Sequence, residues 1–164
     1  MAKMGQSFLQ VDDFYNQPFP ELLMTLVREI GSACIKNDYR KDLYMSLRLA
    51  IGLIENFPDL IDDYIPDILE MANEVMEYAN THNDNQSKTE RKNNVKAQGC
   101  QVICMCFWYN SDLTMRYIIE KKLDVLVVDL TTCLPLFTSD FEKERALYAM
   151  NGLIKMDASL WPKV

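Results

Sequence analysis

The sequence predicts an all-α protein, namely a HEAT-like α-solenoid of stacked antiparallel helical hairpins with about seven helices. The 164 residues include only five Gly and six Pro, so few positions interrupt a helix. Apolar residues recur every three or four positions through most of the chain, which is typical of amphipathic helices. Similar helix–turn–helix units recur at a spacing of about 50 residues, as in HEAT and armadillo arrays. An irregular helical bundle is the alternative.

Three helices are expected before residue 80. The first spans about 20–35, because Pro20 is tolerated in the first turn of a helix. The second spans about 40–56, and Pro58 ends it, since the residue before a proline avoids the helical conformation. The third spans about 63–79. Its apolar face consists of Ile65, Ile68, Leu69, Ala72, Val75, Met76 and Ala79.

Four further helices are expected after a mobile polar linker at residues 80–89. The fourth spans about 90–109, and its second half, "VICMCFWY", is apolar all round, so it should be the most buried element. The remaining three are expected at about 113–121, 125–137 and 140–156. We therefore interpret residues 1–164 as one HEAT-repeat segment.

An internal repeat supports the solenoid. "IGLIENFPDLI" (51–61) aligns with "NGLIKMDASLW" (151–161) at an offset of 100 residues. Gly52 meets Gly152, and Leu-Ile follows the glycine in both copies. Because glycine weakens a helix interior, we interpret both glycines as points where another helix approaches closely.

The same register suggests that the chain is a fragment of a longer array. Val164 corresponds to Tyr64, where a further helix of the earlier copy begins, so the sequence stops in the middle of a repeat. Natural solenoids carry polar capping repeats at both ends, and we find neither here. The expectation is therefore a piece of a longer solenoid.

Charge and cysteine content limit the classes of function. The net charge of −7 provides no basic footprint for direct nucleic-acid binding. The longest apolar run, residues 102–109, is far too short to span a membrane. Five cysteines, an odd number, do not make a disulfide framework. A reducing compartment, the cytoplasm or the nucleus, is therefore expected.

No catalytic residue, cofactor site or metal site is expected. His82 is the only histidine and lies in the polar linker without a visible catalytic partner. Cys100, Cys104 and Cys106 lack the second ligand pair of a zinc site, and we interpret them as core residues. The five glycines are scattered, so no phosphate-binding loop is present. The protein is expected not to be an enzyme.

The candidate binding site is an acidic stripe on the third predicted helix. It consists of Asp63, Asp67, Glu70, Glu74 and Glu77. Their spacing of 4, 3, 4 and 3 residues places them on one helical face, opposite the apolar face. Residues 49–87 hold nine acidic side chains and no Lys or Arg. Neighbouring like charges on a helix repel by about 0.2–0.5 kcal/mol per pair, so a helix selected for stability alone would interleave Lys.

Two interpretations of the acidic stripe remain open. It is either a solvated helix face or an acidic face on an inner helix that binds a Lys/Arg-rich protein. In a solenoid the inner helices line a concave groove, where such fields add across repeats.

Much of the chain resembles the C-terminal HEAT repeats of importin-beta-type karyopherins, with the closest likeness to the importin-7/importin-8 group. The resemblance covers about residues 42–164. It rests on "LYMSLRLAIGLIENFPDLIDDYIPDILEMANEVM", on "QGCQVICMCFWYNSDLTMRYIIE" and on "LPLFTSDFEKERALYAMNGLIKMD". Points of likeness are an aromatic "YN" that ends one helix and a short turn before a charged helix start.

The resemblance implies a nuclear transport receptor that works in both cytoplasm and nucleus. Inner helices of such proteins grip basic cargo proteins and Ran-GTP, and outer helices bind Phe-Gly nucleoporins. The full-length protein would make the Ran-GTP and nucleoporin contacts, and this segment would bind cargo or support the solenoid. The alternative is a HEAT-repeat scaffold or assembly subunit unrelated to nuclear transport.

Overall fold

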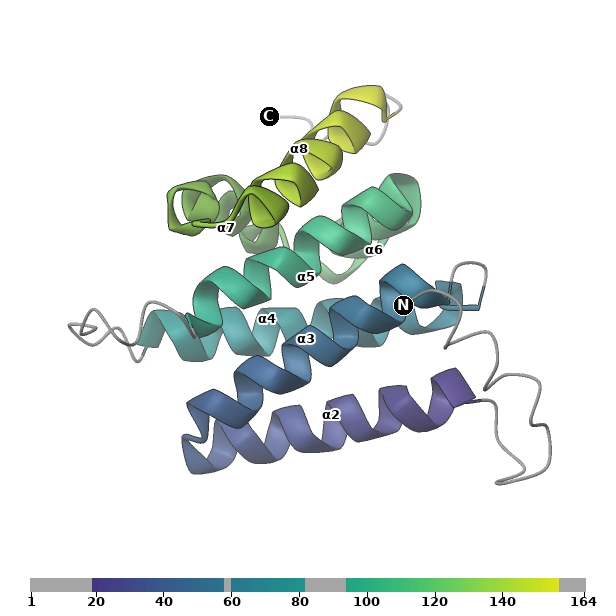
Figure 1. The fold of residues 1–164 in the computed structure, drawn as a ribbon. Helices are drawn as coiled ribbons and strands as arrows, with labels where there is room; N and C mark the ends of the chain where they lie inside the picture. The colour runs from purple at the N-terminus through teal and green to yellow at the C-terminus, as the bar shows by residue number, and fades with distance from the viewer. Residues whose placement is uncertain (1–18, 58–59, 82–93, 157–164) are drawn as a thin grey trace.

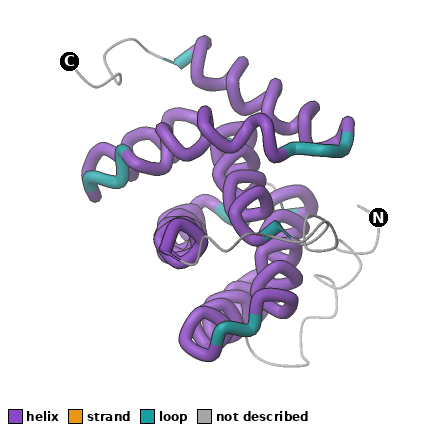
Figure 2. Tube along the Cα trace, turned by 90° about the vertical axis from the view of Figure 1, so that its left-hand side faces the viewer, coloured by secondary structure: helices purple, strands orange, loops and turns teal. Residues whose placement is uncertain are grey.

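The computed structural model describes residues 19–57, 60–81 and 94–156, and this part of the chain contains seven α-helices and no strand (Figure 1). The helices are α2 (Phe19–Asn37), α3 (Arg40–Asn56), α4 (Ile65–Thr81), α5 (Val95–Tyr109), α6 (Ser111–Lys121), α7 (Val125–Cys133) and α8 (Asp140–Lys155). The 3-10 turns η1 (Asp62–Tyr64) and η3 (Leu134–Leu136) precede α4 and follow α7. The predicted all-α fold of packed helical hairpins is confirmed, and Figure 2 shows the described segments as helices with short loops.

The helices form two layers. One layer contains α2, α4 and α6, which pack against one another in that order. The other contains α3, α5 and α8, again in order, and its helices contact each other more extensively. In Figure 1 these three lie one above another, with α5 in the middle. Contacts of α2 with α3 and of α4 with α5 join the two layers.

α5 is the centre of the molecule, because it packs against α3, α4, α6, α7 and α8. Nearly every side chain from Val95 to Phe107 is buried, so the prediction that this helix is the most buried element is confirmed. The predicted start at residue 90 is wrong. Asn94 is the N-cap: its side chain accepts a hydrogen bond from the Ala97 N–H at 3.1 Å and fixes the first turn at Val95.

Two further predicted boundaries differ from the structure. Asn80 and Thr81 belong to α4 instead of the linker, because the Thr81 hydroxyl donates to the Glu77 carbonyl at 3.0 Å and completes the last turn. Residues 82–89 of the predicted linker lie outside the described residues. The sixth predicted helix ends at Cys133 instead of 137, since Pro135 has no N–H to continue it and the chain tightens into η3.

The two copies of the internal repeat occupy matching places. α3 and α8 flank α5 in the same layer. At Gly152 a Cβ atom would lie 2.3 Å from Ser111 Oγ and 3.0 Å from the Phe107 carbonyl oxygen, so the predicted close approach is confirmed. At Gly52 the prediction is wrong, because no described atom lies within 4 Å of that Cβ position.

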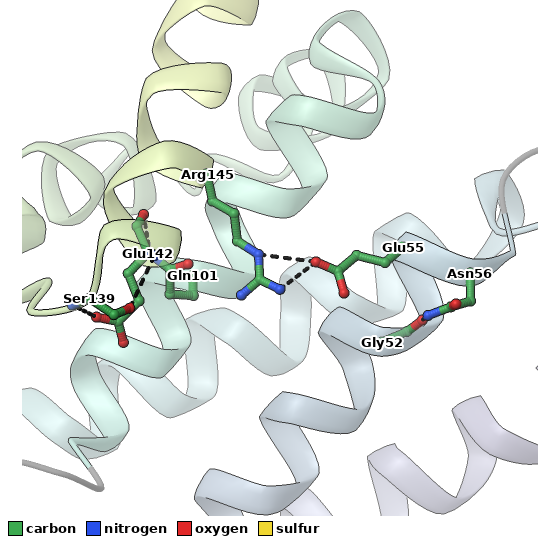
Figure 3. A network of polar contacts seen from close by, with 7 residues as sticks. All are labelled: Gly52, Glu55, Asn56, Gln101, Ser139, Glu142 and Arg145. Atoms are coloured by element: carbon green, nitrogen blue, oxygen red, sulfur yellow. Dashed lines mark hydrogen bonds and ion pairs between the residues drawn. The ribbon is translucent and has the colours of Figure 1, made fainter. Parts of the chain in front are cut away.

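An ion pair joins α3 to α8 across α5 (Figure 3). The Arg145 guanidinium donates through Nε to Glu55 Oε1 at 3.1 Å, and a second nitrogen contacts the same oxygen. The Arg145 guanidinium also lies over the Phe141 ring, 4.0 Å from its centroid. The first and third helices of this layer therefore approach within the reach of one arginine side chain.

Hydrogen bonds fix the start of α8 beside α5. Ser139 Oγ accepts from the Glu142 N–H, and the Glu142 carboxylate accepts from the Ser139 N–H, which is a capping box. Gln101, fully buried on α5, donates its side-chain N–H to the Glu142 carbonyl at 3.1 Å (Figure 3). α8 is therefore held in register on the central helix.

Candidate protein-binding surface

Packing against α2, α5 and α6 holds the helix that carries the acidic stripe. Its buried residues are Ile65, Ile68, Leu69, Met71, Ala72, Val75, Met76 and Tyr78. This set contains the predicted apolar face apart from Ala79, which is half-buried. Because these side chains are spaced three and four residues apart, their burial turns the opposite face of α4 toward solvent.

The acidic stripe lies on that outer face. Asp63, Glu70, Glu74 and Glu77 are exposed, and Asp67 is half-buried. Asp63 belongs to η1, one turn ahead of α4, and the other four follow on α4 itself. The shared face predicted from the spacing is therefore present in the structure. α4 lies in the layer with α2 and α6, and the prediction that this helix lines a groove stays a prediction.

Neighbouring helices occupy the first half of the acidic stripe. Arg28 of α2 lies with a guanidinium nitrogen 3.4 Å from an Asp67 carboxylate oxygen. Tyr117 of α6 donates its hydroxyl to Glu70 Oε1 at 2.6 Å. Sequence reasoning missed both partners, because they lie far from α4 in the chain. The only signal for these partners in the sequence is the position of Arg28 and Tyr117 along their own helices.

The second half of the acidic stripe is open. The Glu77 carboxylate accepts a hydrogen bond from Asn73 on the same helix, at 2.9 Å from Asn73 Nδ2 to Glu77 Oε1. Among the described residues, Glu74 makes no hydrogen bond or ion pair. Lys96, the nearest cation along α5, bonds Asn80 Oδ1 at 2.6 Å instead. Within the described part of the chain, two exposed carboxylates are therefore without a partner from another helix.

Two tyrosines at this surface have raised pKa values. Burial raises the pKa of Tyr117 to about 12, and its hydrogen bond to Glu70 acts in the same direction because it favours the neutral phenol. Burial also raises the pKa of Tyr64, with further contributions from Glu21, Asp63 and Asp67. Both phenols stay neutral at ordinary pH, so this surface keeps its acidic charge without added phenolate.

Cys100, Cys104 and Cys106 lie in the core, as predicted. All five cysteines are buried. Burial raises the pKa of Cys104 to about 12 and that of Cys106 still further, so neither is an activated thiolate. Cys100 directs its thiol to the Asp129 carbonyl, 3.6 Å away.

The sequence also raised the questions of a catalytic histidine, a metal site and a membrane span. His82 lies outside the described residues. Within 19–57, 60–81 and 94–156, no group of three or more His, Cys, Asp or Glu side chains is placed to hold a metal ion. None of the helices described is both long enough and apolar enough to cross a lipid bilayer.

The fold and this surface define a class of protein, an all-α array of stacked helical hairpins with an acidic helix face. Comparisons with known protein families, with curated proteins and with solved structures each found no match.

Proposed function

We propose that this chain is a protein-binding segment of a helical-repeat array, and that α4 binds a Lys/Arg-rich partner through its acidic stripe. One observation carries the proposal. Glu74 and Glu77 are exposed on a helix that has no basic residue, and among the residues that the structure describes no side chain from another helix pairs with them. Basic side chains of a partner would relieve the repulsion that these carboxylates exert on each other.

The two halves of the acidic stripe have different parts in this proposal. Asp67 and Glu70 already have partners, Arg28 and Tyr117, so they fix the position of α4 and add to the field. The open half supplies the contacts. Salt screens the attraction between exposed charges, and the Debye length is about 10 Å at 0.1 M salt. Binding should therefore weaken steeply as salt is added.

We place this segment in an importin-like nuclear transport receptor, with basic cargo proteins as partners in the cytoplasm and nucleus. The support is the resemblance of residues 42–164 to karyopherin HEAT repeats. In the alternative, the chain belongs to a HEAT-repeat scaffold unrelated to nuclear transport. Binding of Ran-GTP and of a Phe-Gly nucleoporin peptide to the full-length protein would separate the two, because only a transport receptor should bind both.

The test of the binding proposal is titration calorimetry with a short Lys/Arg-rich peptide at low and high salt. The wild-type chain should bind at low salt and lose most of its affinity at high salt. The Glu74→Lys/Glu77→Lys variant should bind at least tenfold more weakly at low salt. Equal affinity in the two proteins, or no binding by either, would contradict the proposal.

A matched control separates the acidic stripe from overall charge. Glu29→Lys/Glu144→Lys makes the same charge change at exposed positions on α2 and α8. This variant should keep most of the wild-type affinity. If it loses as much affinity as the stripe variant, the peptide responds to net charge and not to α4.

A further inference from the structure

Two cysteines from different helices lie against each other in the core, and the proposed function does not use them. Cys100 belongs to α5, and Cys133 is the last residue of α7. Both side chains are fully buried, and they are hydrogen-bonded to each other. Because α5 and α7 pack directly on each other, the fold brings together two thiols that are far apart in the sequence.

The backbone of α7 independently places Cys100 beside Cys133. The Cys100 thiol is directed at the Asp129 carbonyl oxygen, 3.6 Å away. Asp129 is four residues before Cys133, so in an α-helix its carbonyl accepts the Cys133 N–H. The Thr132 hydroxyl donates to the same oxygen at 3.1 Å. Cys100 therefore points at the helical turn that carries Cys133.

The two thiols differ in reactivity, and Cys133 is the better nucleophile. The hydrogen bond from Cys100 lowers the pKa of Cys133; burial opposes this change, and the charge of Lys96 supports it. The same hydrogen bond, together with burial, raises the pKa of Cys100, so Cys100 keeps its proton. Since the thiolate is the reactive form, an oxidant should react with Cys133 first. Cys104, one turn after Cys100, is a poor competitor because burial raises its pKa to about 12.

The short helix α7 offers a small oxidant a way into the core. It has nine residues and no side-chain cap at its N-terminus. Its Asp129 is buried, and among the described residues no group donates a hydrogen bond to Asp129 Oδ2. A buried carboxylate oxygen without a donor lowers the stability of the helix that holds it. Local opening should therefore be more frequent in α7 than in α5, which other helices surround.

We propose that Cys100 and Cys133 are a site of reversible oxidation, at which hydrogen peroxide forms a disulfide that links α5 to α7. Intracellular disulfides of this kind are transient and redox-sensing, so the site is compatible with a reducing compartment. The proposal does not depend on the acidic stripe.

The reaction has two steps. The Cys133 thiolate attacks one peroxide oxygen, the O–O bond breaks, and hydroxide leaves and takes up a proton to become water; Cys133 is now a sulfenic acid. The Cys100 sulfur then attacks the Cys133 sulfur, the S–S bond forms, the S–O bond breaks, and a second water leaves with the Cys100 proton. Two thiols are oxidised and one peroxide is reduced. Two equivalents of a small thiol reverse the reaction by thiol–disulfide exchange.

Peptide mapping of the oxidised chain tests the pairing. The native chain is treated with hydrogen peroxide, the remaining thiols are blocked with N-ethylmaleimide, and the digested product is sequenced by mass spectrometry. The expected product has one disulfide, between Cys100 and Cys133, and is blocked at the other three cysteines. Dithiothreitol should restore both thiols. No disulfide, or a disulfide spread evenly over several cysteine pairs, would contradict the proposal.

Alanine variants provide matched controls for the pairing. Cys100→Ala and Cys133→Ala should each abolish the disulfide. Cys104→Ala and Cys106→Ala remove equally buried thiols from α5 and should leave the disulfide unchanged. If Cys104→Ala abolishes it as completely as Cys100→Ala, with both variants folded by circular dichroism, the assigned pair is wrong. The map of the wild-type chain still decides the pairing if one of the variants fails to fold.

A sulfenic-acid reagent identifies the cysteine that reacts first. In Cys100→Ala, the sulfenic acid at Cys133 has lost its resolving thiol, so dimedone should trap it. Trapping at Cys133 in this variant should be at least tenfold faster than trapping at Cys100 in Cys133→Ala. Equal rates in the two variants, or faster trapping at Cys100, would contradict the assignment of Cys133 as the nucleophile.

Discussion

α3 and α8 carry the same Gly-Leu-Ile triplet at matching positions, yet corresponding residues of the two helices differ in their exposure to solvent. Ile54 is 1% exposed, and Ile154, its counterpart one hundred residues later, is 79% exposed. Leu47 and Leu147 differ in the same way. α5 packs against the side of α3 that carries Leu47 and Ile54. No described helix packs against the corresponding side of α8. The apolar pattern of a helix in a stacked array thus defines two packing faces, and position in the stack decides which face is buried.

The largest expected effect comes from changing the two isoleucines in parallel. Ile54→Ala should lower the free energy of unfolding by about 2–5 kcal/mol, because it opens a cavity in the core. Ile154→Ala should change it by less than about 0.5 kcal/mol, since this side chain is almost fully exposed. Urea unfolding followed by circular dichroism measures both. Similar losses at the two sites would mean that Ile154 is buried by a neighbour in solution.

The bridge between α3 and α8 should have an intermediate effect. Arg145→Ala removes the ion pair to Glu55 and the contact with the Phe141 ring, and should cost about 1–2 kcal/mol. Glu55→Ala should cost less, because it leaves the ring contact intact. The Arg145→Ala/Glu55→Ala double variant gives the coupling between them. A coupling near zero in this cycle would show that the two helices do not depend on this bridge.

The helix starts should differ by about 1 kcal/mol. α8 begins with the Ser139–Glu142 capping box, and the N-cap of α3, Tyr39, makes no side-chain capping bond. Ser139→Ala should therefore lower stability by about 1 kcal/mol. Introducing the missing cap by Tyr39→Ser should not reproduce such a loss and is expected to stabilise α3 slightly. A loss at Tyr39 equal to that at Ser139 would be evidence against the capping difference.

The smallest effect is a pH dependence at the start of α8. Partial burial acts to raise the pKa of Glu142, but hydrogen bonds from the Ser139 and Thr138 N–H groups and hydroxyls outweigh it and hold the pKa below its usual value. Glu142 thus stabilises the folded state at pH values above the pKa of an unfolded glutamate, about 4.3.

That contribution is lost as the pH falls through the lower folded pKa, because the protonated carboxyl no longer accepts these bonds. Stability curves measured from neutral to acidic pH should show this loss in the wild-type chain. Glu142→Gln should flatten the acid limb by a few tenths of a kcal/mol. Identical curves would mean that the capping carboxylate does not control the acid response.

Local signals in the sequence were enough to predict most of the fold. The period of the apolar residues placed α3 almost to the residue and the start of α6 within two residues, because each helix buries one continuous stripe. The start of α5 was misplaced, since polar residues before Asn94 have helical composition and only the cap defines the boundary. Gly52 was misjudged because a sequence match cannot state which neighbour is present.

The exposed acids of the candidate site could be predicted from the sequence, but their contacts with other helices could not. Helical spacing determines which side of α4 carries the acids, so the exposure of Glu70, Glu74 and Glu77 followed from the sequence. The neutralising contact from Arg28 did not, because it depends on how α2 and α4 pack. Charge counted along one helix overestimates the field when another helix supplies the counterion.

An NMR titration of the 19.1 kDa chain with a Lys/Arg-rich peptide shows whether α4 is the binding surface. We expect the largest amide shifts at low salt to fall on α4 around Glu70, Glu74 and Glu77, and to disappear at high salt. α3 and α8, with their apolar outer sides, should stay nearly unchanged. Shifts concentrated on α8 or spread evenly over the molecule would contradict a binding surface on α4.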